Sequence, residues 1–433
     1  MEEIAFIHLS DIHFRKSSGN GADIDADLRN AILTDIKYNA KENLCNVKGI
    51  LIGGDIAFAG QREEYDIAKE FLKELASILE IDEKSIYCVP GNHDVNQQFV
   101  KNSKSILDAQ SELDKSETLD LADSLLEKYI LDQASPNLLF KSIEEYNNFV
   151  AIYGCNINSE RPVWTEEFHL DNDMRLKICG MNSCIISSHK DHEDSAVIRK
   201  MIIGQSQIPF YEDNVIWVSL CHHPVEFWKF ANEIQTKLDK RIDIQLYGHK
   251  HEQAIEANSE RLVISAGATH PTRGKKWNPR YNWISFACIR KEDDRDDRFV
   301  VVKTYPRVLS KDRDKFEADR LSCEEGSNFF KYELNIDNKR RKNLQDDFLI
   351  QTEKKALQKN NRAVFQGIEK EIVYNFFELS YVQQNEILLK LNLFRNEYAG
   401  KRYIELFDKI LDDAREKECL CHLDKMIRQK CKE

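Results

Sequence analysis

Short apolar runs alternate with longer amphipathic stretches through the first three hundred residues of the chain. Ile4–Leu9, Gly49–Ile52 and Ser85–Val89 are rich in apolar and β-branched residues, and each predicts a buried strand. Apolar residues recur at helical spacing from Tyr65 to Leu79, and a similar stretch around residues 28–36 lies between the first two strands. Strands joined by such crossover helices indicate an α/β fold.

The pattern changes after Asp94. Residues 100–150 are polar with widely spaced leucines, which predicts a helical insertion beside the sheet. Strand-like runs then return at Met174–Cys179, Val215–Leu220, Ile242–Tyr247, Arg261–Ser265, Trp283–Ile289 and Phe299–Thr304. Because few helices separate these runs, we expect a second, partly antiparallel sheet.

Strand signals end near Tyr332, and the rest of the chain has helical periodicity. Ser380 and Gln383 have the spacing of a capping box at the start of a helix. Phe407, Ile410 and other apolar residues then recur on one helical face. We therefore expect two domains, an α/β domain over residues 1–320 and an all-α domain over residues 335–433.

Composition and charge narrow the functional classes. Hydrophobic residues make up 42% and charged residues 31% of the 433 residues, as in a folded soluble protein. No apolar stretch is long enough to span a membrane, and the start lacks a secretory signal, so a cytoplasmic location without membrane contact is expected. The eleven cysteines are scattered singly, which favours reduced thiols.

The charge is unevenly distributed along the chain. The net charge is −12, and residues 331–433 carry 21 basic against 18 acidic residues, which leaves −15 for residues 1–330. This balance argues against a general nucleic-acid coat protein.

Five polar motifs each begin where an apolar run ends, the place at which open α/β sheets bind ligands. The motifs are Ser10-Asp11-Ile12-His13, Gly53-Gly54-Asp55, Pro90-Gly91-Asn92-His93-Asp94, Cys221-His222-His223-Pro224 and Tyr247-Gly248-His249-Lys250-His251. Their carboxylate, amide and imidazole groups suit Mn²⁺, Fe or Zn²⁺ in near-octahedral sites better than a structural zinc. Glycine directly before Asp55, Asn92 and His249 lets the chain turn sharply or approach closely there.

In this order, the five motifs resemble those of the calcineurin-like metallophosphoesterase superfamily, and the resemblance covers residues 1 to about 305. It implies a four-layered α/β/β/α sandwich around two divalent metal ions, with Mn²⁺ as the leading candidate and Fe or Zn²⁺ as alternatives. The implied ligands are Asp11, His13 and His251 for the first metal, Asn92, His222 and His249 for the second, and Asp55 for both.

The resemblance also implies roles around the metals. His93 would be the catalytic histidine that is not a ligand, with Asp94 orienting it through a hydrogen bond, and a metal-bridging hydroxide would attack phosphorus. His222 is the better ligand of its pair because it lies two residues before the proline, which makes His223 a neighbour. His270 lies near the last motif in sequence, and Lys250 and Arg273 are candidates for contacts with a substrate phosphate.

The substrate class stays open between three alternatives. The third motif ends in Asp94, which is typical of phosphodiesterases and repair nucleases, and the segment His8–Phe14 resembles the nuclease and cyclic-nucleotide branches. We therefore expect a phosphodiester substrate, either a nucleic acid or a cyclic nucleotide. A phosphomonoesterase acting on a nucleotide or protein, and a metal-stabilised interaction module, are the alternatives.

Three further segments carry weaker predictions. The insertion at 100–150 is either a cap over the substrate or a decoration. The basic run Lys339–Lys342 is better explained as a solvated linker than as a nucleic-acid contact. The helical tail is similar to protein-interaction adaptors attached to effector enzymes in bacterial anti-phage systems, which implies a protein partner.

Overall fold

The computed structural model describes residues 3–16, 25–192, 200–258, 261–270, 278–291, 297–337, 372, 375–377, 379–394, 407–417 and 419–430. The chain divides into two compact units, Met1–Asn343 and Leu344–Glu433. The first unit holds both β-sheets, and the second is helical in its described residues.

The first sheet has seven strands in the order β12-β11-β10-β1-β2-β3, with β13 also paired to β11. The strands are β1 Glu3–Leu9, β2 Val47–Ile52, β3 Ile86–Cys88, β10 Arg280–Arg290, β11 Arg298–Leu309, β12 Phe316–Ala318 and β13 Phe330–Asn335. The first three are parallel, whereas β10 runs antiparallel to β1. The strand-like runs at Trp283 and Phe299 therefore belong to this sheet and not, as expected, to the second. β1 is buried along most of its length, and its backbone groups pair with β10 on one edge and with β2 on the other.

The second sheet has six strands in the order β4-β5-β6-β7-β9-β8. The strands are β4 Trp164–His169, β5 Arg175–Met181, β6 Val215–Cys221, β7 Ile244–Tyr247, β8 Gln253–Ala257 and β9 Leu262–Ala266. The four central strands are parallel and the edge strands β4 and β8 are antiparallel. A partly antiparallel second sheet is thus confirmed, although both edge strands were missed because few of their residues are buried.

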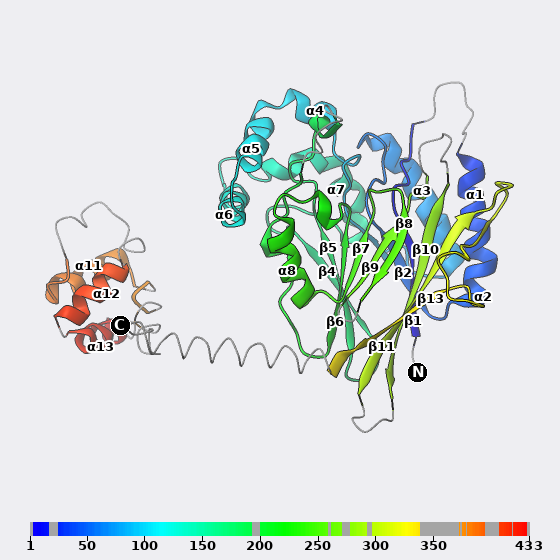
Figure 1. Ribbon diagram of the computed structural model, residues 1–433. Helices are drawn as coiled ribbons and strands as arrows, with labels where there is room; N and C mark the ends of the chain where they lie inside the picture. The colour runs from blue at the N-terminus through cyan, green and yellow to red at the C-terminus, as the bar shows by residue number, and fades with distance from the viewer. Residues whose placement is uncertain are drawn as a thin grey trace. The chain divides into compact units, whose positions relative to one another are not determined.

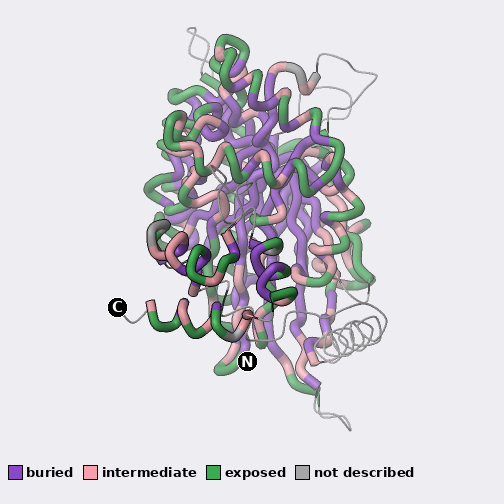
Figure 2. The backbone as a smooth tube through the Cα atoms, turned by 90° about the vertical axis from the view of Figure 1, so that its left-hand side faces the viewer, coloured by how far each residue is buried: buried purple, intermediate pink, exposed green. Residues whose placement is uncertain are grey.

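Helices cover the outer face of each sheet (Figure 1). Helices α1 (Ala26–Asp35) and α3 (Arg62–Leu79) lie on the seven-stranded sheet, and α1 continues through a π-helical turn, Ile36–Ala40, into α2 (Lys41–Asn43). Helix α8 (Ala231–Arg241) lies on the six-stranded sheet. The inner faces pack on each other, as the 5.0 Å separation of the Phe6 and Phe168 rings shows. The expected four-layered α/β/β/α sandwich is therefore present, with its buried residues concentrated along the strands (Figure 2).

The expected helical insertion is present after the third motif. It consists of α4 Gln97–Asn102, α5 Lys104–Asp114, α6 Leu119–Ile130, a 3₁₀ helix at Leu138–Ile143, and α7 Glu144–Val150. Its α5 contacts the loops of the six-stranded sheet, because the Gln110 amide donates to the carbonyls of Ile185 and Ser187. The carbonyl of Asp114 in turn accepts from the ammonium of Lys229. The insertion therefore buttresses the loops that follow β5 and β6.

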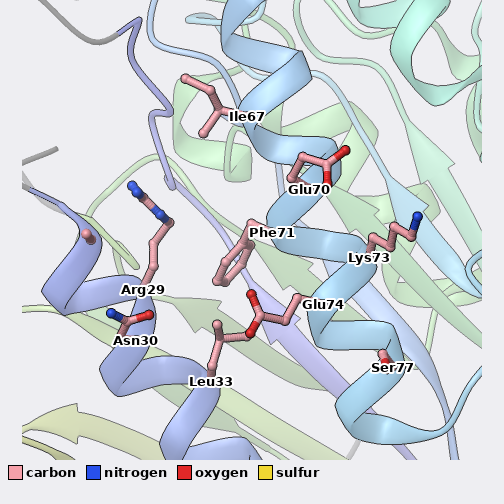
Figure 3. Close-up of a pocket in the computed structure, with 10 residues that line it drawn as sticks. Arg29, Asn30, Leu33, Ile67, Glu70, Phe71, Lys73, Glu74 and Ser77 are labelled. Atoms are coloured by element: carbon pink, nitrogen blue, oxygen red, sulfur yellow. The ribbon is translucent and has the colours of Figure 1, made fainter. Parts of the chain in front are cut away.

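Helices α1 and α3 enclose a groove of about 560 Å³ on the outer layer (Figure 3). Phe71 and Leu33 lie between the two helices, and Arg29 and Glu74 line the same groove. None of the expected metal ligands lines it, so it is separate from the expected metal site.

The second unit contains α11 Tyr381–Lys390, α12 Phe407–Glu416 and α13 Leu420–Lys430. The predicted capping box is confirmed, since Ser380 and Gln383 satisfy each other's backbone N–H groups at the start of α11. Ile387, Leu411 and Ile427, one from each helix, belong to a separate buried cluster. The basic run at Lys339–Lys342 lies outside the described residues.

The boundary between the domains differs from the expected one. Strand β13 pairs with β11 beyond the expected end of the α/β domain at residue 320. Tyr332 and Leu334 alternate with polar neighbours in β13 and are buried, so this short strand belongs to the sheet. Among the described residues, no helix is both long and apolar enough to cross a membrane.

Candidate metal centre

Loops at the carboxyl ends of five strands meet at one edge of the two sheets. The loop after β1 is hydrogen-bonded to the loop after β2, because the backbone N–H groups of Ile12 and His13 donate to the carbonyl of Asp55 at 3.0 and 2.9 Å. The loop after β7 joins the loop after β6, with the N–H of Gly248 donating to the carbonyl of His222 at 3.1 Å. The backbone N–H of His249 donates to Oδ2 of Asp11 at 3.1 Å, which joins motifs 238 residues apart in sequence.

Five of the expected ligands have a left-handed backbone conformation, with φ between 52° and 69°. They are Asp11, His13, Asp55, His249 and His251. Each such residue costs about 1–2 kcal/mol relative to a right-handed one. Strain of this kind persists where the surroundings fix it, and it is concentrated at functional sites.

The glycines before the ligands serve two distinct purposes. Gly54 has a φ of 93°, so it is needed for its backbone conformation. Gly91 and Gly248 are needed for close approach: a Cβ on Gly91 would lie 2.1 Å from Oδ1 of Asp55, and one on Gly248 would lie 2.0 Å from Oγ of Ser10. Any side chain at these two positions would push the loops apart.

A first cluster is formed by Asp11, His13 and His251, whose potential ligand atoms lie within 4.8 Å of one another. Oδ1 of Asp11 is 3.2 Å from Nε2 of His251. Oδ2 of Asp11 accepts hydrogen bonds from Oγ of Ser10 at 2.6 Å and from the backbone N–H of His249 at 3.1 Å. The second oxygen is thus fixed, and Oδ1 is left to face the imidazoles.

A second cluster is formed by Asn92, His222 and His249. Oδ1 of Asn92 is 3.1 Å from Nε2 of His222 and 3.1 Å from Nδ1 of His249, and the two ring nitrogens are 3.3 Å apart. Nδ1 of His222 lies 2.8 Å from the carbonyl of Gly53 and must donate to it, so Nε2 is the ring nitrogen that faces the cluster. Three donor atoms at this separation fit one cation with bonds of about 2.1 Å.

Asp55 lies between the two clusters. Its Oδ1 accepts the backbone N–H of His93 at 2.8 Å. Its Oδ2 is 3.4 Å from Nε2 of His222 in the second cluster and 4.0 Å from Nε2 of His13 in the first cluster. One carboxylate oxygen therefore faces both clusters.

The electrostatics of the site favour cations. Burial opposes ionisation of Asp55, but the neighbouring His222 outweighs it and holds the pKa of Asp55 well below its ordinary value. Burial lowers the pKa of His222, yet the charge and hydrogen bond of Asp55 raise it to about 9 overall. Burial lowers the pKa of His13 and of His249 to about 4, so both are neutral donors at pH 7. The charged Asp55 carboxylate together with the neutral imidazoles of His13 and His249 is a donor set that a divalent cation fits.

A family model described as "Calcineurin-like phosphoesterase" matches residues 4–253, more than half of the chain. The chain belongs to the calcineurin-like phosphoesterase family. Members of this family are metal-dependent hydrolases of phosphoesters. A second family model, "GTPase-associated adaptor domain", matches residues 368–429 of this phosphoesterase.

Solved structures similar to this phosphoesterase show low identity. The hypothetical protein PH1004 from Pyrococcus horikoshii OT3 is 12% identical, with a TM-score of 0.31 over 65% of this chain and 82% of that one. A putative 5′-nucleotidase from Staphylococcus aureus is 15% identical, with a TM-score of 0.32 over 77% and 54%. Vps29 from Entamoeba histolytica, complexed with Zn²⁺, is 13% identical, with a TM-score of 0.27 over 77% and 99%. No curated protein matches the chain in sequence.

The third motif of the phosphoesterase is arranged differently from the expected His93–Asp94 pair. Nδ1 of His93 lies 2.7 Å from the carbonyl of Phe58. The Asp94 carboxylate accepts instead from the N–H groups of Ile56 at 3.2 Å, Ala57 at 2.9 Å and Gly91 at 2.9 Å, and from the Tyr65 hydroxyl at 2.9 Å. The expected hydrogen bond between His93 and Asp94 is therefore wrong, because backbone donors and a buried phenol use both carboxylate oxygens.

His223 and His270 lie beside the phosphoesterase's clusters. Nδ1 of His223 is 2.8 Å from Oγ of Ser183, and the ring lies within 4.8 Å of the donor atoms of His222 and His249. Nε2 of His270 is 2.8 Å from Oδ1 of Asp25, while the backbone N–H of His270 donates to the carbonyl of Asp11. His270 therefore supports the first motif through its backbone.

The two expected phosphate contacts have different outcomes. Nζ of Lys250 lies 2.7 Å from Oε1 of Glu226, so its charge is already paired. Arg273 lies outside the described residues.

Two aromatic side chains beside the clusters were missed at the level of sequence. The ring of Phe58 is 5.4 Å from that of His93, and the ring of Phe227 is 4.5 Å from that of His249. Phe58 lies three residues after Asp55 and Phe227 lies three residues after Pro224. The available signal was an aromatic residue shortly after a motif, on the solvent side of the strand end.

Proposed function

We propose that this phosphoesterase hydrolyses a phosphodiester of a nucleic acid or nucleotide, using two divalent cations held by the two clusters. The observation that carries the proposal is the position of Asp55, whose Oδ2 faces His222 on one side and His13 on the other. A carboxylate shared by two donor clusters is the arrangement that a two-cation hydrolase requires. Mn²⁺ is the proposed cation, with Fe or Zn²⁺ as alternatives.

The donor set fits such cations. Oδ1 of Asp11 and Nδ1 of His13 are buried and have no hydrogen-bond partner among the described residues, which is costly unless a cation or water satisfies them. Asp11, His13 and His251 would hold one cation, Asn92, His222 and His249 the other, and Asp55 both. When bound, the two cations would activate a water and neutralise charge on the phosphoryl oxygens.

His93 is the proposed catalytic residue. A carbonyl accepts and cannot donate, so Nδ1 of His93 carries the proton that it shares with Phe58, and Nε2 is the ring nitrogen left for substrate. As the water oxygen bonds to phosphorus it loses one proton to solvent, the ester P–O bond breaks, and a protonated Nε2 donates its proton to the departing alkoxide. Asp94 contributes by positioning, since it ties the Gly91 loop to the Ile56–Ala57 loop.

The diester preference rests on the third motif's ending in Asp94 and is tested by comparing two reporters. Bis(4-nitrophenyl) phosphate and 4-nitrophenyl phosphate are incubated with Mn²⁺ and the wild type or Asp55→Ala. Diester hydrolysis that Asp55→Ala abolishes is the expected result. Hydrolysis of the monoester alone would replace the proposal with a phosphomonoesterase.

A second candidate function concerns the C-terminal unit and is favoured by the adaptor-domain match over residues 368–429. We propose that this unit binds a protein partner, and the printed name of the model points to a GTPase. Its separate buried core in the described helices supports a module that folds around its own residues. Capture of a GTPase from the source cell by the full chain, lost on deletion of residues 344–433, is the expected result.

A further inference from the structure

Two partly exposed aromatic side chains flank the candidate metal centre, one at each cluster. Phe58 is 38% exposed, and its ring lies 6.3 Å from the ring of His13 as well as 5.4 Å from that of His93. Phe227 lies 4.5 Å from His249, nearly perpendicular to it at 86°. The first belongs to the side of the Asp11 cluster and the second to the side of the Asn92 cluster.

Each aromatic ring is accompanied by a cation. The guanidinium carbon of Arg15 lies over the Phe58 ring, 3.9 Å from its centre, which is a cation–π contact. Nζ of Lys200 lies 6.0 Å from the centre of the Phe227 ring and also donates to the carbonyl of Glu226. Arg15 is exposed, and among the described residues no carboxylate pairs with it. Its charge is therefore available to a phosphate group.

We propose that Phe58 with Arg15, and Phe227 with Lys200, are two stacking platforms that each receive one nucleobase of a single-stranded nucleic acid, with the scissile phosphodiester between them. The inference rests on the proposed phosphodiesterase function and names its substrate class. A phosphomonoester or a cyclic mononucleotide carries one base and would leave one platform unused. An internucleotide diester carries one organic group on each side.

The chemistry of the platforms favours bases in a single strand. Nucleobases stack on aromatic rings and on guanidinium planes, and each stack is worth about 1–3 kcal/mol by alanine substitution. Bases in a duplex present only their edges, so a site that binds through stacking requires unpaired bases. The side chain of His93 lies next to Phe58, which places the departing nucleoside on the Arg15 side and the retained one at Phe227.

The test uses three dinucleotides and three variants. Thymidylyl-(3′→5′)-thymidine is compared with two analogues in which an abasic tetrahydrofuran residue replaces either the first or the second nucleoside. Phe58→Leu and Phe227→Leu keep an apolar side chain but remove the ring. Phe210→Leu is the matched control, because Phe210 is 78% exposed and its ring centre lies 5.0 Å from the guanidinium carbon of Arg241, but it contacts none of the expected ligands.

The wild type and the control are expected to prefer the two-base substrate over each half-abasic analogue by about tenfold in kcat/KM, a stack of the usual size. Phe58→Leu should lose only the preference for a base on the departing nucleoside. Phe227→Leu should lose only the preference for a base on the retained nucleoside. Equal hydrolysis of all three substrates by the wild type, or loss on the same side in both variants, would overturn the proposal.

A fourth substrate separates this inference from the function on which it rests. Methyl 4-nitrophenyl phosphate is a diester without a base. If the wild type hydrolyses it and also hydrolyses all three dinucleotide substrates equally, the stacking proposal fails and the proposed phosphodiesterase function stands. No hydrolysis of any diester would overturn both proposals.

Discussion

Gly91 and Asp55 approach so closely that a Cβ on the glycine would lie 2.1 Å from Oδ1 of the carboxylate. Gly91→Ala should therefore displace the carboxylate that faces both clusters. We expect a loss of about 1–3 kcal/mol in the free energy of unfolding, as for an overpacked core, measured by urea denaturation. Turnover of the diester reporter should fall by about a hundredfold, because displacements near 1 Å have that effect.

Gly154→Ala is the control for backbone strain. Gly154 has a φ of 69° and nothing lies within 4 Å of the position of a Cβ. This variant should lose about 1–2 kcal/mol from the left-handed conformation alone, with unchanged turnover. Full activity in Gly91→Ala would mean that Asp55 is not held as the structure has it.

His93→Ala should bind both cations and lose turnover by about 10²–10⁴-fold, the contribution of a positioned acid or base. Metal content by elemental analysis and kcat on the diester reporter are the two measurements. His169→Ala, which removes an exposed histidine on β4, serves as the control. If His93→Ala lost a cation, His93 would have to be placed among the ligands.

Asp94→Asn should act through loop position and not through the ionisation of His93. An amide at this position replaces one carboxylate oxygen by an NH2 group, which would face either the N–H groups of Ile56 and Gly91 or the N–H of Ala57 and the Tyr65 hydroxyl. We therefore expect a loss of about 1–3 kcal/mol in stability and reduced kcat. The pH profile of kcat should keep its shape. A shifted pH profile would indicate that Asp94 pairs directly with His93.

Tyr65→Phe tests the same set of hydrogen bonds to Asp94 by removing only one of them. It removes one donor and leaves three, so about 1 kcal/mol of stability should be lost, with a small loss of kcat. Tyr146→Phe is the matched control, because Tyr146 is equally buried and its hydroxyl donates to the carbonyl of Cys88. The control should lose similar stability and no activity.

Because His8 is buried, we expect the free energy of unfolding of the protein to depend on pH. His8 lies in β1 with both ring nitrogens buried and without a hydrogen-bond partner among the described residues, and burial lowers its pKa to about 3. In the unfolded chain His8 takes up a proton below pH 6.5, whereas the folded protein does not until about pH 3. Acid therefore favours unfolding through this residue, by about 2 kcal/mol between pH 6.5 and 5.0.

Urea denaturation of the wild type and His8→Leu at several pH values, in the presence of a chelator, isolates this contribution. The difference in stability between the two proteins should be constant above pH 7 and should grow in favour of His8→Leu as the pH falls below 6.5. Parallel pH curves for the two proteins would mean that His8 is charged or hydrogen-bonded in the folded state.

The sequence was most informative where periodicity and burial coincide. The stripe from Tyr65 to Leu79 predicted α3, and the apolar runs predicted the buried central strands of both sheets. Edge strands such as β4 and β8 were missed, because they face solvent and carry polar residues. The return of β10 and β11 to β1 was also missed, since pairing between distant strands leaves no local pattern.

The candidate site was predictable as a set of motifs and not as a geometry. Motif order named Asp11, Asp55 and His222, and the structure brings their donor atoms within 4.8 Å of one another. The role of Asp94 was not predictable, because its partners are mostly backbone N–H groups that any sequence supplies. Phe58 was overlooked because aromatic residues near strand ends are common in ordinary cores.

In the proposed site, two cations share Asp55. The most direct measurement is an electron paramagnetic resonance titration of the metal-free protein with Mn²⁺, performed on the wild type and on Asp55→Asn. The wild type should take up two Mn²⁺ per chain and show the signal of an exchange-coupled pair, and Asp55→Asn should lose the coupling. A single uncoupled Mn²⁺ in the wild type, or an unchanged coupled pair in Asp55→Asn, would mean that Asp55 is not shared by two cations.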